Sequence, residues 1–177
     1  MKRMAWMLAA LVAVLTTAAC GSTSSDAPAC NTASPIYTPV QGTWAMCAPA
    51  SLTTSMKNTI TVSGCGVVVA NDVYPASLDC TGTVVRAAAG TGTITFGTAV
   101  ANTGFNTAAT PVTAYQLDVL GTITPTGGSA QALAMYTLGY VNGTTLYMGD
   151  TSGANDGTTP AKRPTILDGY YPFTKIP

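Results

Sequence analysis

Cysteines are the side chains of this sequence with the most distinctive chemistry. Cys20 directly follows an apolar segment and a short run of small residues. Four more cysteines occupy positions Cys30, Cys47, Cys65 and Cys80. A cysteine sulfur can be acylated, can bind a metal or can form a disulfide, and the surrounding residues decide between these outcomes.

Histidine and glutamate are both absent from the 177 residues. Without histidine, Ser-His-Asp and Cys-His sites are excluded and the commonest metal ligand is missing. A hydrolase that uses paired carboxylates would need two aspartates to converge across a cleft. Most of the aspartates instead lie at expected strand ends and turns, where Asp bonds to local backbone. We therefore expect a protein that is not an enzyme and that holds no cofactor.

Two stretches could in principle bind a metal. The oxygen-rich loop 150–157 is a candidate for calcium, but it lacks the alternating acids and the glutamate of an EF-hand, and an ordinary turn is the alternative. The four later cysteines could bind zinc, but no CxxC pair and no histidine is present to complete such a site. We therefore expect no metal site.

The N-terminal residues have the pattern of a secretory signal. Met1-Lys2-Arg3 is a short positive start, residues 4–15 (MAWMLAALVAVL) are apolar, and small residues follow. A membrane-spanning helix needs about 20 apolar residues, so this segment is too short to span. The pattern predicts export and removal of the segment.

Residues 17–20 (TAAC) resemble the lipobox of bacterial lipoproteins. The resemblance implies cleavage before Cys20 and attachment of a diacylglyceryl group and acyl chains such as palmitate. Thr17 stands where the family usually has Leu, and Leu15 lies two residues earlier. In that family an Asp after the cysteine retains the protein at the inner membrane, so Gly21 implies a lipid-anchored protein of the outer membrane.

These segments predict three parts of the chain. They are a signal peptide at 1–19, the lipidated cysteine and a flexible tether at 20–35, and a single β-barrel-like domain at 36–177. Without the two basic residues of the leader, five basic and seven acidic residues remain, a net charge of −2. Such a balance provides no basic face for nucleic acid.

Export would place the four later cysteines in an oxidising compartment, where an even number fits disulfides. Four cysteines allow three pairings. We prefer Cys47–Cys80 with Cys30–Cys65, because Cys47 ends the first expected strand and Cys80 ends a hairpin that returns beside it.

The remaining sequence is rich in Thr, Ala, Gly and Val, which favours strands and turns. Eight strands are expected, at 42–48, 52–63, 66–73, 77–87, 91–101, 112–124, 131–141 and 144–150. Asn142-Gly143 predicts a type I′ turn that pairs Tyr140 with Thr145 and Leu138 with Tyr147. The tail from 151 to 177 is expected to wrap the barrel or to cap one end, with a short strand at 171–175.

Short strands in series predict an all-β fold, an antiparallel meander closing into a small barrel of about eight strands, with a β-sandwich as the alternative. Gly42-Thr43-Trp44 resembles the Gly-x-Trp that opens the first strand of lipocalins, where the Trp plugs the closed end. In that family a basic residue near the last strand packs across the Trp, a role that the resemblance assigns to Arg163 or Lys175.

Two functional hypotheses remain open. In the first, a lipocalin-like barrel holds a small apolar ligand in an interior of about 300 Å³ or more, lined by Tyr136, Tyr140 and Tyr147. In the second, the chain is a non-catalytic structural or interaction lipoprotein that meets another envelope protein. In both, the lipid anchor makes the membrane its partner.

Overall fold

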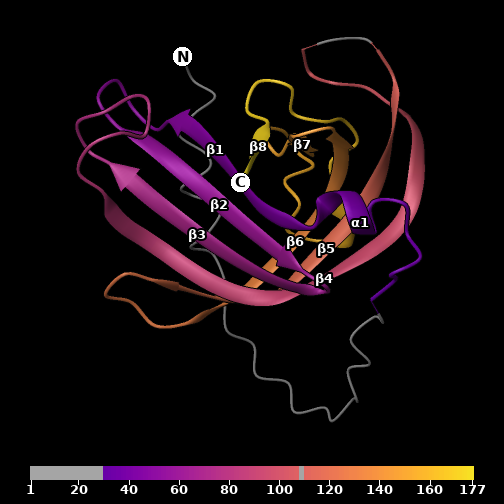
Figure 1. Ribbon diagram of the computed structural model, residues 1–177, viewed down its shortest axis with the longest axis horizontal. Coiled ribbons are helices and arrows are strands. Elements are labelled where there is room, and N and C mark those ends of the chain that lie inside the picture. The colour runs from indigo at the N-terminus through magenta and orange to yellow at the C-terminus, as the bar shows by residue number, and fades with distance from the viewer. Residues whose placement is uncertain (1–29, 108–109) are drawn as a thin grey trace.

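The computed structural model describes residues 30–107 and 110–177. Within these residues, eight antiparallel strands follow one another around a closed barrel, and the last pairs with the first (Figure 1). The strands are β1 (Gly42–Pro49), β2 (Ser55–Ser63), β3 (Gly66–Tyr74), β4 (Val85–Thr103), β5 (Val112–Pro125), β6 (Gln131–Asn142), β7 (Thr145–Met148) and β8 (Phe173–Ile176). The expected lipocalin-like barrel is confirmed, and the β-sandwich alternative is wrong.

The four residues of β8 close the barrel. β8 pairs with β7 through Leu146 and Phe173, and with β1 through Trp44 and Lys175. A short strand was expected in the tail at 171–175, in addition to the eight strands of the barrel. The tail does form this strand, and as β8 it removes the last open edges, which would otherwise be free to pair with another chain.

Alternating residues of the strands point inward and form the main hydrophobic core, because successive side chains of a strand lie on opposite faces. Its buried members are Ile36, Val40, Trp44, Met46, Ala48, Val62, Val67, Ile94, Phe96, Leu117, Val119, Leu146 and Phe173. The core therefore runs through the barrel rather than between two layers.

One end of the barrel, here called the closed end, is covered by the short helix α1 (Tyr37–Val40). The indole Nε1 of Trp44 donates a hydrogen bond of 2.7 Å to the carbonyl of Val40, and Trp44 is fully buried. The Lys175 ammonium lies 5.2 Å from the centroid of the Trp44 ring. Of the two basic residues expected near the Trp, Lys175 takes this position and Arg163 lies elsewhere.

Strand β4 corrects the prediction of two strands at 77–87 and 91–101, because residues 85–103 form one strand and residues 77–84 lie in the β3–β4 loop. The glycines near the predicted break do not form a turn. A Cβ built on Gly90 or Gly92 would collide with a backbone carbonyl of β5, and Gly92 lies directly opposite Gly121. Here glycine allows two backbones to approach closely, which is the other common reason for glycine within a strand.

The β6–β7 hairpin exists, but its register differs from the prediction. Asn142 pairs with Thr145, so the two turn residues are Gly143 and Thr144, and Tyr140 pairs with Tyr147. Gly143 has a φ of +59°. Glycine at the first central position suits a type II′ turn, which competes with the predicted type I′ turn for the same sequence. The pairing moves by two residues, so each side chain keeps its predicted face.

Both predicted disulfides are confirmed. Cys47–Cys80 joins β1 to the β3–β4 loop, and Cys30–Cys65 joins the start of the described chain to the β2–β3 turn, with Cα atoms 6.0 and 5.9 Å apart. The second bond and the burial of Ser34 place residues 30–35 in the folded region. The predicted boundary between tether and domain at residue 36 is therefore too late.

Between β7 and β8 the chain leaves the barrel wall and covers the outside of β5 and β6. It includes the short 3-10 helix η1 (Pro160–Lys162). The carbonyl of Gly157 accepts a hydrogen bond from the amide of Tyr136 at 2.9 Å. Leu167 is fully buried with Ala114 and Leu138 in a second, external core. This confirms that the tail wraps the barrel.

The close approach of β4 and β5 can be tested by adding one methyl group. Gly92→Ala should destabilise the protein by about 1–3 kcal/mol, because the new Cβ has no space against β5. Gly104→Ala is the matched control, since nothing lies within 4 Å of a Cβ built there. Urea unfolding of both variants measures the difference, and equal stabilities would contradict the packing described.

Candidate functional site

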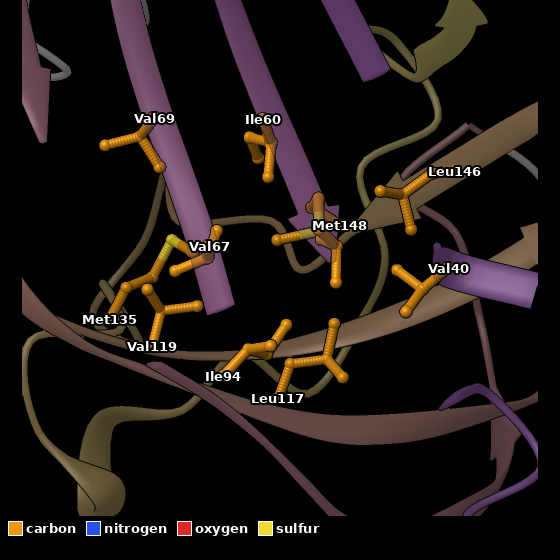
Figure 2. Close-up of a pocket in the computed structure, with 11 residues that line it drawn as sticks. Val40, Ile60, Val67, Val69, Ile94, Leu117, Val119, Met135, Leu146 and Met148 are labelled. Atoms are coloured by element: carbon orange, nitrogen blue, oxygen red, sulfur yellow. The ribbon is translucent and has the colours of Figure 1, made fainter. Parts of the chain in front are cut away.

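The interior of the barrel is where a lipocalin-like fold would hold a small ligand. Its remaining void has a volume of about 20 Å³ and lies between apolar side chains of several strands and Val40 of α1 (Figure 2). Its walls are Val40, Ile60, Val62, Val67, Val69, Ile94, Leu117, Val119, Met135, Leu146 and Met148. Sites for small molecules usually have about 300–1,000 Å³, so this interior is filled.

The chemistry of these walls leaves nothing to orient a ligand. A buried water needs roughly 10–15 Å³ of space and two to four polar partners. The void has room for one water, but its walls expose no polar surface. Met135 and Met148 point into the void from β6 and β7 (Figure 2). Such flexible side chains fill irregular gaps in a core, which is the role they have here.

The tyrosines expected to line a ligand cavity lie on the outside of the barrel. Tyr140 and Tyr147 stack with ring centroids 6.0 Å apart, and Phe105 packs edge-on against both. They adjoin the external core with Leu138 and Leu167. The expectation of an interior tyrosine face is therefore wrong. The hairpin has two apolar faces, and the face carrying Met135 and Met148 points inward.

Tyr136 belongs to a polar contact that holds the β7–β8 connection to the barrel. The guanidinium of Arg163 lies 5.8 Å from the centroid of its ring and forms an ion pair of 2.5 Å with Asp118. The same guanidinium donates hydrogen bonds to the carbonyls of Thr137 and Leu117 at 2.8 and 3.2 Å. The planar guanidinium of arginine has several fixed donors, so it can bind the carboxylate and both carbonyls at once. This contact holds the β7–β8 connection to the barrel.

The oxygen-rich loop 150–157 has its acidic oxygens directed to different partners. Asp150 accepts from the amide of Ser152 and from the side-chain amide of Asn106, at 2.9 and 3.0 Å. Asp156 bonds to Thr158, and the ammonium of Lys162 lies 3.6 Å away. Within residues 30–107 and 110–177, no group of three or more Cys or Asp side chains is arranged to hold a metal ion.

The loops that join β1 to β2 and β3 to β4 lie at the end of the barrel opposite α1 (Figure 1). These loops and the first residue of β4 carry an exposed apolar surface. We call it the apolar rim, and its members are Leu52, Leu78, Val84 and Val85, which are 87, 54, 49 and 52% exposed. A shallow groove of about 330 Å³ adjoins it in the second loop, between Pro75 and Thr83. Sequence reasoning missed this surface, although Leu52 between Ser51 and Thr53 is an apolar residue in a polar loop.

The loops that carry the rim are held in a fixed conformation. The hydroxyls of Ser77 and Thr81 donate to the carboxylate of Asp79 at 2.6 and 2.7 Å. The amide of Cys80 donates to the hydroxyl of the fully buried Ser55 at 3.0 Å. Together with the Cys47–Cys80 disulfide, these bonds attach the β3–β4 loop to β1 and β2.

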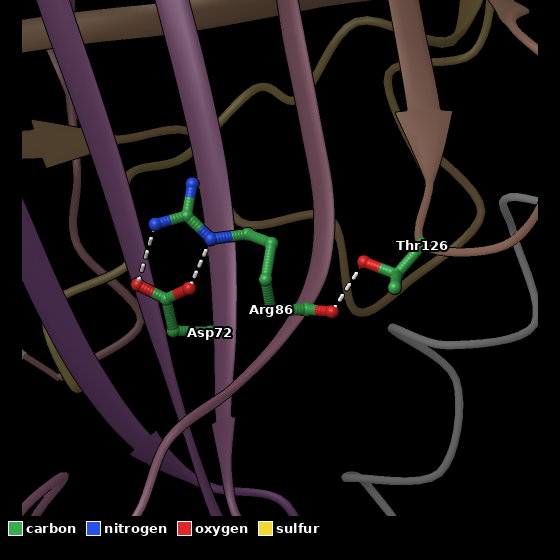
Figure 3. A network of polar contacts seen from close by, with 3 residues as sticks. All are labelled: Asp72, Arg86 and Thr126. Atoms are coloured by element: carbon green, nitrogen blue, oxygen red, sulfur yellow. Dashed lines mark hydrogen bonds and ion pairs between the residues drawn. The ribbon is translucent and has the colours of Figure 1, made fainter.

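Two of the charged groups beside the rim are paired with each other. Arg86 of β4 forms a two-pronged ion pair with Asp72 of β3, and the hydroxyl of Thr126 donates to the carbonyl of Arg86 (Figure 3). Such a pair presents little net charge to its surroundings.

Cys20, the expected lipidation site, lies outside the described residues. Among the residues described, no helix has the length and apolar character needed to cross a bilayer.

No protein-family model, no curated protein and no solved structure matches this chain. Its class therefore follows from the architecture itself. It is a small, closed, lipocalin-like β-barrel of eight antiparallel strands, with a filled interior in the part of the chain described.

The loop bearing the rim should respond to acid. Hydrogen bonds from Ser77, and then from Thr81, hold the pKa of Asp79 below its usual value. A lowered pKa in the folded state contributes stability that is present above the unfolded pKa and is lost as the pH falls through the folded pKa. Carboxyl NMR titration should find Asp79 ionised to lower pH than an ordinary Asp, and Ser77→Ala should raise its pKa. An unchanged titration in Ser77→Ala would contradict this assignment.

Proposed function

We propose that this chain is a lipid-anchored envelope protein that acts through the outside of its barrel, as a structural or interaction protein. The observation that carries the proposal is the filled interior. A void of about 20 Å³ is more than ten times smaller than a small-molecule site requires. The hypothesis of a small apolar ligand inside the barrel loses its support, because its cavity and its tyrosine lining are both missing.

The cell envelope is proposed from three sequence features. They are the basic and apolar leader, the lipobox-like residues 17–20 and the Gly at position 21. Both disulfides fit this location, since such bonds are rare in the reducing cytosol. The lipid on Cys20 would make the membrane the first partner of the chain, and another envelope protein is the expected second partner.

A non-catalytic role is supported by the side chains available for chemistry. The sequence has no histidine and no glutamate. Asp72, Asp118 and Asp156 each pair with a cation. Asp79 accepts bonds from two hydroxyls of its own loop. These carboxylates bond to neighbours in loops and on the barrel wall, and none of them contacts the interior void.

The anchor is tested by mass analysis of the protein from a membrane fraction. Its first residue should be Cys20 carrying a diacylglyceryl group and acyl chains, because the sulfur is the acceptor. Cys20→Ala should leave the chain without acyl groups and uncut at this position, whereas Ser22→Ala should be processed as the wild type. A wild-type protein without lipid would contradict the anchor and the location together.

The filled interior is tested by native mass spectrometry of the protein purified from the envelope. The mass should equal the anchored chain alone, without a bound small molecule. Leu117→Ala serves as the positive control, since it removes a fully buried side chain beside the void. This variant should lose about 2–5 kcal/mol of stability and take up a small apolar probe such as benzene. A stoichiometric apolar ligand in the wild type would restore the binding hypothesis.

A further inference from the structure

We propose that the apolar rim is a second membrane contact, which places the end of the barrel opposite α1 on the bilayer that holds the lipid anchor. The inference rests on the proposed function, because the lipid on Cys20 supplies the first contact. The side chains of the rim, which the barrel leaves exposed, would contact the apolar region of the lipid bilayer.

The chemistry of the rim favours lipid over a protein partner. Its four members are aliphatic, and Leu52 is the most exposed large apolar side chain among those described. Strong protein–protein contacts usually centre on Trp, Tyr or Arg, whereas Leu and Val are under-represented there. Leu and Val are instead favourable in the apolar part of a membrane. Arg86 is the nearest guanidinium, and Asp72 already binds it.

The charges near the rim limit how deep such a contact can go. Arg86 and Asp72 neutralise each other. The carboxylate of Asp79 is exposed and accepts bonds from the hydroxyls of Ser77 and Thr81, so it must stay at the depth of the headgroups while Leu78 beside it enters the apolar region. Lys57 lies at the same end of β2, and its positive charge is attracted to anionic headgroups.

The loops that carry the rim lose little conformational entropy on binding, because they are already ordered. The disulfide Cys47–Cys80 and the bond from the Cys80 amide to Ser55 fix the β3–β4 loop. The amides of Ala50 and Ser51 both donate to the carbonyl of Thr54, which tightens the turn that carries Leu52. Loops that are already fixed in this way lose little backbone freedom when they bind.

The length of chain ahead of the barrel permits this orientation. Cys30 is bonded to Cys65 in the β2–β3 turn, at the closed end. β2, which runs from the rim to that turn, is about 30 Å long at 3.3 Å per residue. The segment from Cys20 to Cys30 spans at most about 35 Å. The rim can therefore reach the bilayer of the anchor when this segment is almost fully extended along the barrel.

The test uses the acylated full chain added to vesicles of phosphatidylethanolamine and phosphatidylglycerol. An environment-sensitive dye is placed at Leu52→Cys and, as the matched control, at Ile166→Cys, which is also exposed but lies on the β7–β8 connection. Spin-labelled lipids should quench the dye at position 52 at least fivefold more than the dye at position 166. Equal quenching at the two positions would overturn the proposal.

Hydrogen exchange of the acylated chain without a dye provides an independent measurement. Vesicles should protect the amides of loops 50–54 and 75–84 in the wild type, and the exposed double substitution Leu52→Ser with Leu78→Ser should abolish the protection without unfolding the barrel. Protection that persists in this variant would overturn the proposal. So would protection that rises with protein concentration in the absence of vesicles, because the occupant would then be a second copy of the chain.

The two proposals fail in different ways. A chain that carries no lipid on Cys20, but whose dye at position 52 is quenched by added vesicles, would refute the anchor and support the rim contact. A chain that is acylated, but whose rim stays in water, would support the anchor and refute the rim contact.

Discussion

The pairing of β8 with both β1 and β7 is the constraint on which the rest of the molecule depends. β7 and β8 have four residues each, so the barrel is closed by few backbone hydrogen bonds at one side. Closure brings Lys175 over Trp44 and completes the wall around the interior. The chain makes a long excursion between β7 and β8 before it returns to close the barrel. That excursion buries the outer faces of β5 and β6, and Arg163 holds it to the barrel wall.

A barrel that is filled inside and partly covered outside leaves few surfaces for recognition. Large side chains from every side meet in the interior, and the external tyrosines pack beneath a loop. The apolar rim is different because covalent and polar bonds hold it in place while its side chains remain uncovered. An arrangement of this kind is typical of a surface that meets something outside the chain.

Much of the fold could be predicted from local sequence, and the exceptions share a physical cause. Alternating residues identified most strands, and the position of Cys47 beside a returning hairpin identified its partner. The break predicted near Gly90 failed, because a glycine that permits close backbone approach has the same local sequence as one that begins a turn. The register at Gly143 failed because type I′ and II′ turns both accept glycine. In each example the choice depends on contacts between strands, which a single segment of sequence does not contain.

The candidate site was less predictable than the fold. Tyr140 and Leu146 belong to a hairpin with two apolar faces, and periodicity alone does not say which face points inward. The answer depends on the β7–β8 connection, which offers Leu167 as a cover for one face. The exposed Leu52 had a readable signal, an apolar residue among Ser and Thr, but its neighbours in the rim come from a loop distant in sequence.

The position of the Cys30–Cys65 bond has a mechanical consequence. Tension applied through the proposed lipid would enter the barrel at Cys30 and pass across the disulfide into the β2–β3 turn. Residues 31–64 would lie outside this load path, so neither α1 nor β1 would be peeled away from the N-terminal side. If this bond were reduced, the tension would pass along residues 31–64 instead, and β1 with Trp44 could be pulled away from its neighbouring strands. The disulfide therefore protects an anchored barrel from mechanical unfolding.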